Sequence, residues 1–260
     1  MLLHDLDNRG VVSLTLNRPE LHNAFDDSLI AELNRVIALY AANPAVRLLV
    51  LRANGKSFSA GADLNWMKRV AQYDFAENKQ DAEALAQLMF SLHHFPAPTV
   101  AVVQGAAFGG GVGLVSCCDI ALASDNTSFC LSEVKLGLVP AVISPYVIAA
   151  MGARQAQRYF LTAERFNAQT AFALGLVQQL CTPEQLVEEA DKLINTLLTN
   201  SPQALRACKQ LIQRVDAAVN LELQDYTTTL IASLRASAEG KDGLAAFLEK
   251  RQPAWINSNS

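Results

Sequence analysis

The sequence has no excess of positive charge. Its 260 residues include 21 Lys and Arg against 25 Asp and Glu, which gives a formal net charge of −4. Because nucleic acids and anionic membrane surfaces require a basic face on their partner, we expect this protein to bind neither. Charged residues make up only 18% and hydrophobic residues 51%. This composition favours a large buried core over disorder.

Long apolar runs are also absent. No segment reaches the roughly 20 apolar residues that a membrane-spanning helix requires, and the N-terminus lacks the basic and apolar regions of a signal peptide. The five cysteines form no CxxC pair, and no cluster of His, Cys and acidic residues has the spacing of a metal site. We therefore expect reduced, mostly buried cysteines, no metal ion and a cytoplasmic location.

Glycine, by contrast, is concentrated in one place. The stretch "GAAFGGGVGL", residues 105–114, holds five of the 13 glycines. A dinucleotide-binding fingerprint does not fit, because Leu114 stands where the last glycine is needed when the pattern starts at Gly109. A P-loop needs a glycine, four spacer residues and then Gly-Lys-Ser/Thr, and the sequence contains no such run. The segment is therefore not a phosphate-binding loop of either kind.

What remains is a buried strand at 99–105, a turn, and a helix that begins with Gly109–Gly111. The first amides of a helix have no partner within it and lie at its positive end. Such amides can stabilise negative charge on a ligand oxygen, although close packing of helix against sheet would also require small residues. A second loop, "SFSAGADL" (57–64), also follows a buried strand. One amide from each loop would form an oxyanion hole.

Strands and helices alternate in the first part of the chain. Apolar patterns predict strands at 11–17, 46–53 and 99–105, with helices between them. This order is typical of an α/β fold with helices outside a parallel sheet. Beyond residue 183 the pattern is almost entirely helical, and no linker marks a domain boundary.

Several motifs together resemble the crotonase superfamily, also called the enoyl-CoA hydratase/isomerase family. They are "NRPELHNAF", "GKSFSAGADL", "GAAFGGGVGL", "FCLSEVKLGLVP", "LTAERFNAQTAFALGLV" and "FLEKRQPAW". The resemblance implies a ββα spiral core at 1–195 and a C-terminal helical trimerisation region at 196–260. It also implies homotrimers or dimers of trimers and acyl-CoA thioester substrates. Coenzyme A is part of such a substrate, so no separate cofactor is expected.

The resemblance also implies roles for individual residues. The amides of Ala62 and Gly110 would hold the thioester oxygen, with Gly109 beside them in the binding loop. Glu133 would be the catalytic acid and base. Family hydratases carry a second glutamate where this chain has Gly113, so the proton chemistry would fall on Glu133 alone.

Gly113 permits two interpretations. A glycine within a helix costs about 1 kcal/mol relative to alanine. One reason to retain it would be a gap that admits a branched or carboxyl-bearing acyl group. The other would be close packing between helices.

Two further phrases, "GADLNWMK" and "PAVISPYVIAAMG", resemble bacterial methylglutaconyl-CoA hydratases and relatives that act on carboxygeranoyl-type thioesters. The resemblance predicts an acyl-pocket wall made of Trp66, Met67, Leu114, Val139, Ile143 and Tyr146. It predicts that CoA contacts main-chain atoms of two loops, at Asn23, Ala24, Ser59, Ala60, Asp63 and Leu64. Phe247 and Lys250 of the last helix would reach the CoA of a neighbouring subunit.

The favoured function is hydration of a branched 2-enoyl-CoA, with 3-methylglutaconyl-CoA as the best candidate. Family isomerases often keep only the glutamate that matches Glu133, so a double-bond isomerase is an alternative. A module that binds acyl-CoA or RNA without catalysis is the non-enzymatic alternative, which the acidic balance and the retained Glu133 disfavour.

Overall fold

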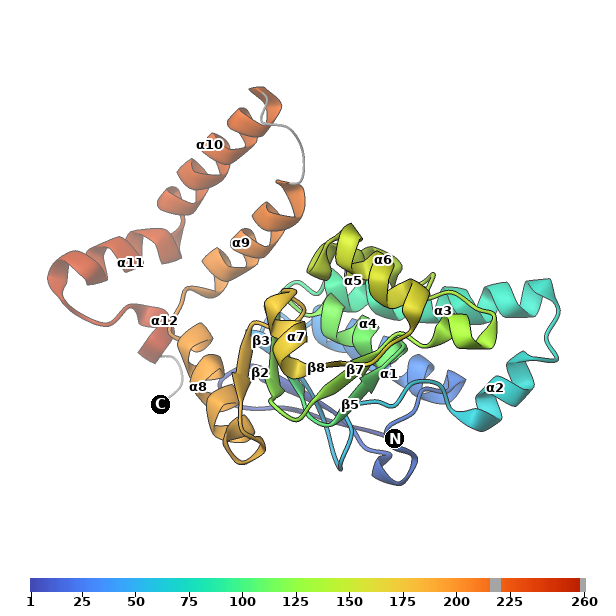
Figure 1. Ribbon diagram of the computed structural model, residues 1–260. Helices are drawn as coiled ribbons and strands as arrows, with labels where there is room; N and C mark the ends of the chain where they lie inside the picture. The colour runs from blue at the N-terminus through green and yellow to red at the C-terminus, as the bar shows by residue number, and fades with distance from the viewer. Residues whose placement is uncertain (216–220, 258–260) are drawn as a thin grey trace.

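The computed structural model describes residues 1–215 and 221–257, which form a mixed α/β fold (Figure 1). A six-stranded sheet has the order β1-β2-β3-β4-β6-β9, and a three-stranded sheet has the order β5-β7-β8. The strands are β1 (Leu2–Leu6), β2 (Val11–Leu16), β3 (Leu48–Ala53), β4 (Thr99–Val103), β5 (Ala106–Phe108), β6 (Ile120–Ser124), β7 (Ser128–Cys130), β8 (Phe166–Asn167) and β9 (Gln179–Cys181). In the larger sheet β1 pairs antiparallel with β2, and the other pairs are parallel.

The α-helices surround the sheets and continue beyond them. They are α1 (Asp27–Ala41), α2 (Leu64–Val70), α3 (Phe75–His93), α4 (Gly110–Cys117), α5 (Ser144–Met151), α6 (Ala153–Thr162), α7 (Ala168–Ala173), α8 (Leu186–Leu198), α9 (Pro202–Arg214), α10 (Leu221–Ala236), α11 (Ala238–Glu249) and α12 (Ala254–Asn257). Short 3-10 helices occupy η1 (Pro19–Leu21), η2 (Glu133–Leu136) and η3 (Pro183–Gln185).

Two turns of the chain pass from the larger sheet to the smaller one before a helix forms. β4 leads to β5 and then α4, and β6 leads to β7 and then η2. After β3 the chain pairs at Ser59 with Ala107 in β5 before it enters α2. The repeat is strand, strand, helix, so the predicted α/β fold with a ββα spiral core is confirmed.

The larger sheet is covered on both faces, as the continuous apolar runs of β3 and β4 predict. Leu49, Leu51 and Ala101 face the main core beneath α1 and α3. Leu48 and Val50 face a second cluster that includes Ile194 of α8. Nearly all of these side chains are fully buried, so the sheet is a rigid support for the loops at its edge.

The boundary predicted at residue 195 falls inside α8, and the division of the chain into two regions stays a prediction. Leu197 and Leu198 still pack against the second core cluster. Beyond them, Figure 1 shows α9, α10 and α11 standing away from the body formed by the sheets. We call residues 199–257, as far as they are described, the helical arm.

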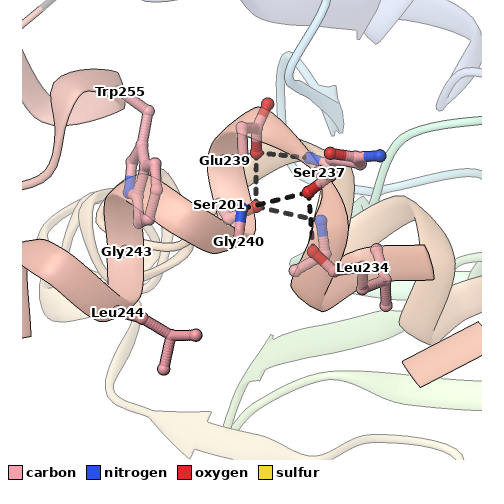
Figure 2. Close-up of a pocket in the computed structure, with 10 residues that line it drawn as sticks. Ser201, Leu234, Ser237, Glu239, Gly240, Gly243, Leu244 and Trp255 are labelled. Carbon is pink, nitrogen blue, oxygen red and sulfur yellow. Dashed lines mark hydrogen bonds between the residues drawn. The ribbon is translucent and has the colours of Figure 1, made fainter. Parts of the chain in front are cut away.

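Polar contacts fix the base of the arm (Figure 2). The Ser201 hydroxyl caps α9 by accepting from Ala204 N at 3.0 Å and donates to the Glu239 carboxylate of α11. Trp255 Nε1 donates to Thr199 O at 3.0 Å. A Cβ on Gly243 would lie 2.8 Å from the Trp255 ring. The cavity of about 250 Å³ at this junction is thus bounded by the contacts that join the arm helices to one another.

A partly buried ion pair joins the arm to the sheet. Lys209 Nζ lies 2.8 Å from Asp119 Oδ2, and the two side chains are 7% and 29% exposed. The same carboxylate accepts from Thr99 N at 2.7 Å, at the start of β4. Asp119 therefore connects two secondary-structure elements and would be left without its cation if Lys209 were lost.

Gly113 marks a close approach between α4 and α5, and the predicted gap facing the acyl chain is wrong. A Cβ at Gly113 would lie 2.4 Å from Ile143 Cγ2 and 3.2 Å from Met89 Cε. Ile143 just precedes α5 and Met89 lies on α3. The space where a family hydratase would place a second glutamate is filled by these two side chains, so the helix-packing interpretation of Gly113 is the right one.

The cysteines match their prediction in part. All five are unpaired; Cys117 and Cys130 are buried, whereas Cys208 is exposed. Burial raises the pKa of the Cys118 thiol to about 12, which keeps it protonated at neutral pH. None of the described helices combines the length and apolarity needed to cross a membrane.

Replacing Lys209 with Met is expected to destabilise the protein by about 2 kcal/mol, because Asp119 loses its cation in a partly buried site. Urea denaturation measures this change. Lys192→Met is the matched control: Lys192 pairs with Glu188 and Glu189 on the exposed face of α8, so its loss should lower the free energy of unfolding much less. Equal effects of the two substitutions would contradict the role assigned to Lys209.

Gly113→Ala is expected to destabilise the protein by about 1–2 kcal/mol, since overpacking outweighs the helix propensity that alanine gains. Ile143→Ala should destabilise it as well, by leaving a cavity. In the double variant the new methyl group fills part of that cavity, so the loss should be smaller than the sum of the two. Thermal melts of the four proteins test this, and a Gly113→Ala variant as stable as the wild type would refute the close packing.

Candidate active site

Two loops are brought together by one parallel pairing. Ser59 N donates to Ala106 O at 3.0 Å, and Phe108 N donates to Ser59 O at 2.8 Å. Ala62 lies three residues after Ser59, and Gly110 lies three residues after Ala107, its bridge partner. The two loops therefore leave the pairing side by side, and both residues line one cavity of about 470 Å³.

The amides of Ala62 and Gly110 are available to a ligand. Within residues 1–215 and 221–257, neither amide donates a hydrogen bond to a protein acceptor. Their neighbours are used: Gly109 N donates to Cys130 O at 2.9 Å and Asp63 N to Phe25 O at 2.7 Å. Gly110 is also the first residue of α4, so its N–H lies at the positive end of the helix dipole. The pair has the character of an oxyanion hole.

Each glycine of the triplet is required by a different neighbour. Gly109 has φ +51° and lies where a Cβ would approach Glu133 Oε1 at 3.2 Å. At Gly110 the Cβ would lie 3.3 Å from the Phe25 ring, and at Gly111 it would lie 2.8 Å from Ser59 O. The triplet thus lets the start of α4 approach both the neighbouring loop and the glutamate.

Glu133 lines the same cavity at the start of η2. Burial raises the pKa of its carboxyl above the usual value, and a hydrogen bond from its own backbone offsets part of that rise. Its Oε2 atom is buried and receives no hydrogen bond from any described residue. A desolvated carboxylate that has one oxygen without a partner and lines a cavity is suited to exchange protons with a ligand.

Asp81 is a second acidic residue in the cavity wall, and sequence reasoning missed it. It lies on α3, where it accepts from Trp66 Nε1 at 3.1 Å. Burial raises the pKa of its carboxyl. The sequence did contain a signal for Asp81. It lies one turn before Leu85 and two turns before Met89, so it is an acidic residue on the apolar face of the helix.

The rest of the cavity wall is almost entirely apolar. Of the predicted acyl-pocket residues, Trp66, Met67, Val139 and Ile143 line it. Further lining residues are Phe25, Val70, Leu85, Leu136, Leu138 and Val142. Leu114 is instead fully buried in the core.

Tyr146 is also corrected, because it packs against His93 with ring centroids 5.2 Å apart and is not part of the cavity wall. None of the described lining residues is Lys, Arg or His.

Two residues of the predicted CoA-binding set lie behind the loops, and their assignment is corrected. Asn23 is fully buried, and its side-chain amide donates to Asn54 O and Ser57 O, both at 2.8 Å. Ser59 is also fully buried, with both main-chain polar atoms in the pairing described above. Both residues hold the loops in place and expose no surface in this structure.

The other predicted CoA-binding residues are closer to the surface. Asp63 caps α2 and pairs with Arg18, whose guanidinium also donates to Ala24 O at 3.2 Å. Ala60 lines the cavity and Leu64 is exposed beside it. Contact of Ala24, Ala60, Asp63 and Leu64 with CoA stays a prediction.

Phe247 and Lys250 lie on the helical arm. Phe247 is 82% exposed, and Lys250 ends α11 with φ +54°. Neither lines the cavity of their own chain. Contact with the CoA of a neighbouring subunit therefore stays a prediction for both. Across the described residues, no group of three or more His, Cys, Asp or Glu could hold a metal ion.

Comparison with known proteins identifies the fold and the family. An enoyl-CoA hydratase structure from Shewanella pealeana superposes with a TM-score of 0.94 at 49% identity, covering 98% of this chain and 95% of that one. The chain is 34% identical to the 2,3-dehydroadipyl-CoA hydratase of Escherichia coli over 94% of each protein. It is 33% identical to the trans-2-decenoyl-[acyl-carrier-protein] isomerase of Streptococcus mutans over 98% of this chain and 97% of that protein. The family described as enoyl-CoA hydratase/isomerase matches residues 7–258, and the chain belongs to it.

Proposed function

We propose that the protein adds water to the double bond of a 2-enoyl-CoA thioester. The observation that carries this proposal is that two unpaired amides and a carboxylate with one unpaired oxygen line a single, mostly apolar cavity. The thioester oxygen binds between Ala62 N and Gly110 N, where negative charge that develops during the reaction is stabilised. An interaction of this kind contributes about 3 kcal/mol per donor to the transition state.

A single carboxylate can complete the reaction. As a water oxygen bonds to Cβ, Glu133 accepts a proton from that water, and the electron pair of the double bond moves toward the thioester oxygen. The resulting enolate is held by the two amides. Glu133 then returns the proton to Cα, which restores its own charge and the thioester carbonyl. If the hydroxyl group and the proton are added to the same face of the double bond, Cα and Cβ both stay within reach of the Glu133 carboxylate.

The substrate we propose is a branched 2-enoyl-CoA, with 3-methylglutaconyl-CoA as the first candidate and leucine degradation as the pathway. The phrases "GADLNWMK" and "PAVISPYVIAAMG" support it by their resemblance to hydratases of that substrate. The similar E. coli protein is named for a thioester that also has a carboxyl group at the far end of its acyl chain. Carboxygeranoyl-type thioesters are the next candidates.

Double-bond isomerisation is the second candidate function. Glu133 and Asp81 are the acidic residues among those that line the cavity, and Gly113 supplies no second glutamate beside the oxyanion hole. An isomerase needs one base to move a proton between two carbons of the substrate. The similar Streptococcus mutans protein is named as such an isomerase.

The protein is proposed to act in the cytoplasm as a homotrimer or a dimer of trimers. The helical arm exposes apolar side chains that a neighbouring subunit could cover, among them Ile212, Phe247 and Leu248. A non-catalytic role in binding RNA has less support, because the net charge of −4 offers no basic excess.

The purified protein is expected to hydrate 3-methylglutaconyl-CoA with a higher kcat/KM than crotonyl-CoA, because the wide apolar cavity is better filled by a branched chain. It is expected to act slowly or not at all on a 3-enoyl-CoA. Loss of the conjugated-thioester absorbance and chromatography of the products measure the three rates. Turnover of the 3-enoyl substrate alone would replace the hydratase proposal by the isomerase.

Glu133→Gln is expected to lower kcat by about 10²–10⁴-fold, the range seen when a positioned acid or base is removed, with little change in binding of the thioester. Steady-state kinetics and calorimetric titration with a saturated acyl-CoA measure the two quantities. Glu164→Gln is the matched control, since Glu164 pairs with Arg158 away from the cavity and should keep nearly full activity.

The pH profile tests the same assignment. Glu133 must be ionised to accept a proton, so kcat/KM should fall as the pH drops through its pKa. Because burial raises that pKa, this fall should begin at a higher pH than an exposed glutamate would give. A near-full rate for Glu133→Gln, or a profile that stays flat down to the ordinary pKa of a glutamate, would contradict the role of Glu133.

A further inference from the structure

The cavity offers no cation to a negatively charged acyl tail. Of the described residues that line it, only Glu133 and Asp81 carry ionisable side chains, and both are acidic. Asp81 lines the cavity beside Ala82 and Leu85 of α3. It also contacts Trp66, a residue of the predicted acyl-pocket wall, so it lies in the apolar part of the cavity that an acyl tail would occupy.

Asp81 is held in a defined orientation. Its Oδ1 accepts from Trp66 Nε1 at 3.1 Å. Trp66 is itself fixed, because it is only 9% exposed and its main-chain N–H donates to the Asp63 cap at 3.2 Å. No described residue donates a hydrogen bond to the other oxygen, Asp81 Oδ2. One carboxyl oxygen is therefore engaged, and the other remains for a ligand.

The charges around Asp81 come from two neighbouring helices. Asp27 of α1 raises the pKa of Asp81, as burial does more strongly, whereas Arg69 of α2 and the Trp66 hydrogen bond lower it. Asp27 and Arg69 pair with each other at 2.5 Å, so the nearest cation is already engaged by a carboxylate. The net direction for the pKa of Asp81 is upward.

We propose that Asp81 binds the terminal carboxyl group of the acyl tail by sharing one proton with it. This inference rests on the proposed function, because it concerns a substrate that carries such a group. One proton is taken up from solvent when the substrate binds and is released when the product leaves. In the complex, the protonated oxygen of one carboxyl donates to the ionised oxygen of the other.

The physical basis is that two carboxylates in contact cannot both remain ionised in a desolvated site. A proton between them forms a short O–H···O⁻ hydrogen bond, which is among the stronger hydrogen bonds in proteins. A buried carboxylic acid that stays neutral can serve as a hydrogen-bond donor in this way. The pair then titrates as one unit, and its affinity depends on the availability of that proton.

A pH dependence follows. Above the pKa values of the two separate carboxyl groups, binding must take up one proton from solvent, so KM for a carboxyl-bearing substrate rises by up to about tenfold per pH unit. For a substrate that lacks the carboxyl group, KM should not follow this titration. Asparagine at position 81 has a permanent N–H donor, so it should bind the carboxylate without the pH dependence.

The experiment compares 3-methylglutaconyl-CoA with 3-methylcrotonyl-CoA, which differ by one carboxyl group. The readout is the ratio of their KM values, or of inhibition constants for a thioester that is bound and not turned over. Any general loss of activity then cancels. The wild type, Asp81→Asn, Asp81→Leu and Arg69→Gln are measured between pH 6 and 9, with circular dichroism to check folding.

We expect Asp81→Leu to shift the ratio against the carboxyl-bearing thioester by about tenfold or more, because the carboxylate of the thioester loses Asp81 as its hydrogen-bond partner. Asp81→Asn should keep the ratio within about threefold of the wild type and make it independent of pH. The Arg69→Gln ratio should stay close to the wild-type value.

Three outcomes would overturn the proposal. Asp81→Leu could bind the carboxyl-bearing thioester as well as the wild type or better, which would mean that Asp81 repels it. The wild-type ratio could be independent of pH. Arg69→Gln could cause the selective loss instead, which would assign recognition to the cation.

Failure of the proposed function would look different, since the wild type would then hydrate other 2-enoyl thioesters but not 3-methylglutaconyl-CoA. In that case inhibition constants are measured for 2,3-dehydroadipyl-CoA, which carries the terminal carboxyl group, and for 3-methylcrotonyl-CoA, which lacks it. The pH dependence of the ratio of these two constants still decides the role of Asp81.

Discussion

The parallel pairing between Ser59 and Ala107 is the contact on which the site depends. It joins two loops that follow different strands of the larger sheet, and it uses main-chain atoms only. Ala62 and Gly110 occupy equivalent places after it, which is why their amides face one cavity. A side-chain substitution cannot delete such donors, but a Cβ at Gly111 would press on Ser59 O and separate the loops. Glycine is therefore required at position 111 because the two loops approach each other closely there.

The electrostatics of the cavity follow from the same geometry. The start of α4 is positive, and the cavity wall is mostly apolar, so negative charge is stabilised at the amides and penalised elsewhere. Glu133 lines the cavity at the start of η2, and one of its carboxylate oxygens is buried without a hydrogen-bond partner among the described residues. The cost of burying that carboxylate raises its pKa and makes it a better proton acceptor from water. Burying this carboxylate lowers the stability of the folded protein, and it does so at the residue that must transfer the proton.

Much of this arrangement could be predicted from the sequence. The glycine run after a buried strand predicted the start of α4, and the apolar runs at 46–53 and 99–105 predicted β3 and β4. These features depend on residues adjacent in the chain. The predicted gap at Gly113 failed because Ile143 fills it, and that residue is 30 positions further along the chain. The position of a side chain so distant in sequence is set by tertiary packing.

The errors at polar residues have a similar cause. Asn23 and Ser59 lie in loops, where polar side chains are usually exposed, yet both are fully buried because they tie loops together. Asp81 was missed because its partner, Trp66, is on another helix. The sequence pattern marks which residues are polar or small, but only the fold decides which of them meet.

The central claim is that two main-chain amides and one glutamate act together on a thioester. A crystal structure of the protein with acetoacetyl-CoA tests it most directly, since this thioester resembles both substrate and product. The account predicts the thioester oxygen within about 3 Å of both Ala62 N and Gly110 N. It also predicts that the Glu133 carboxylate lies beside Cα and Cβ. A thioester oxygen directed away from these amides, or a Glu133 side chain out of reach of both carbons, would contradict it.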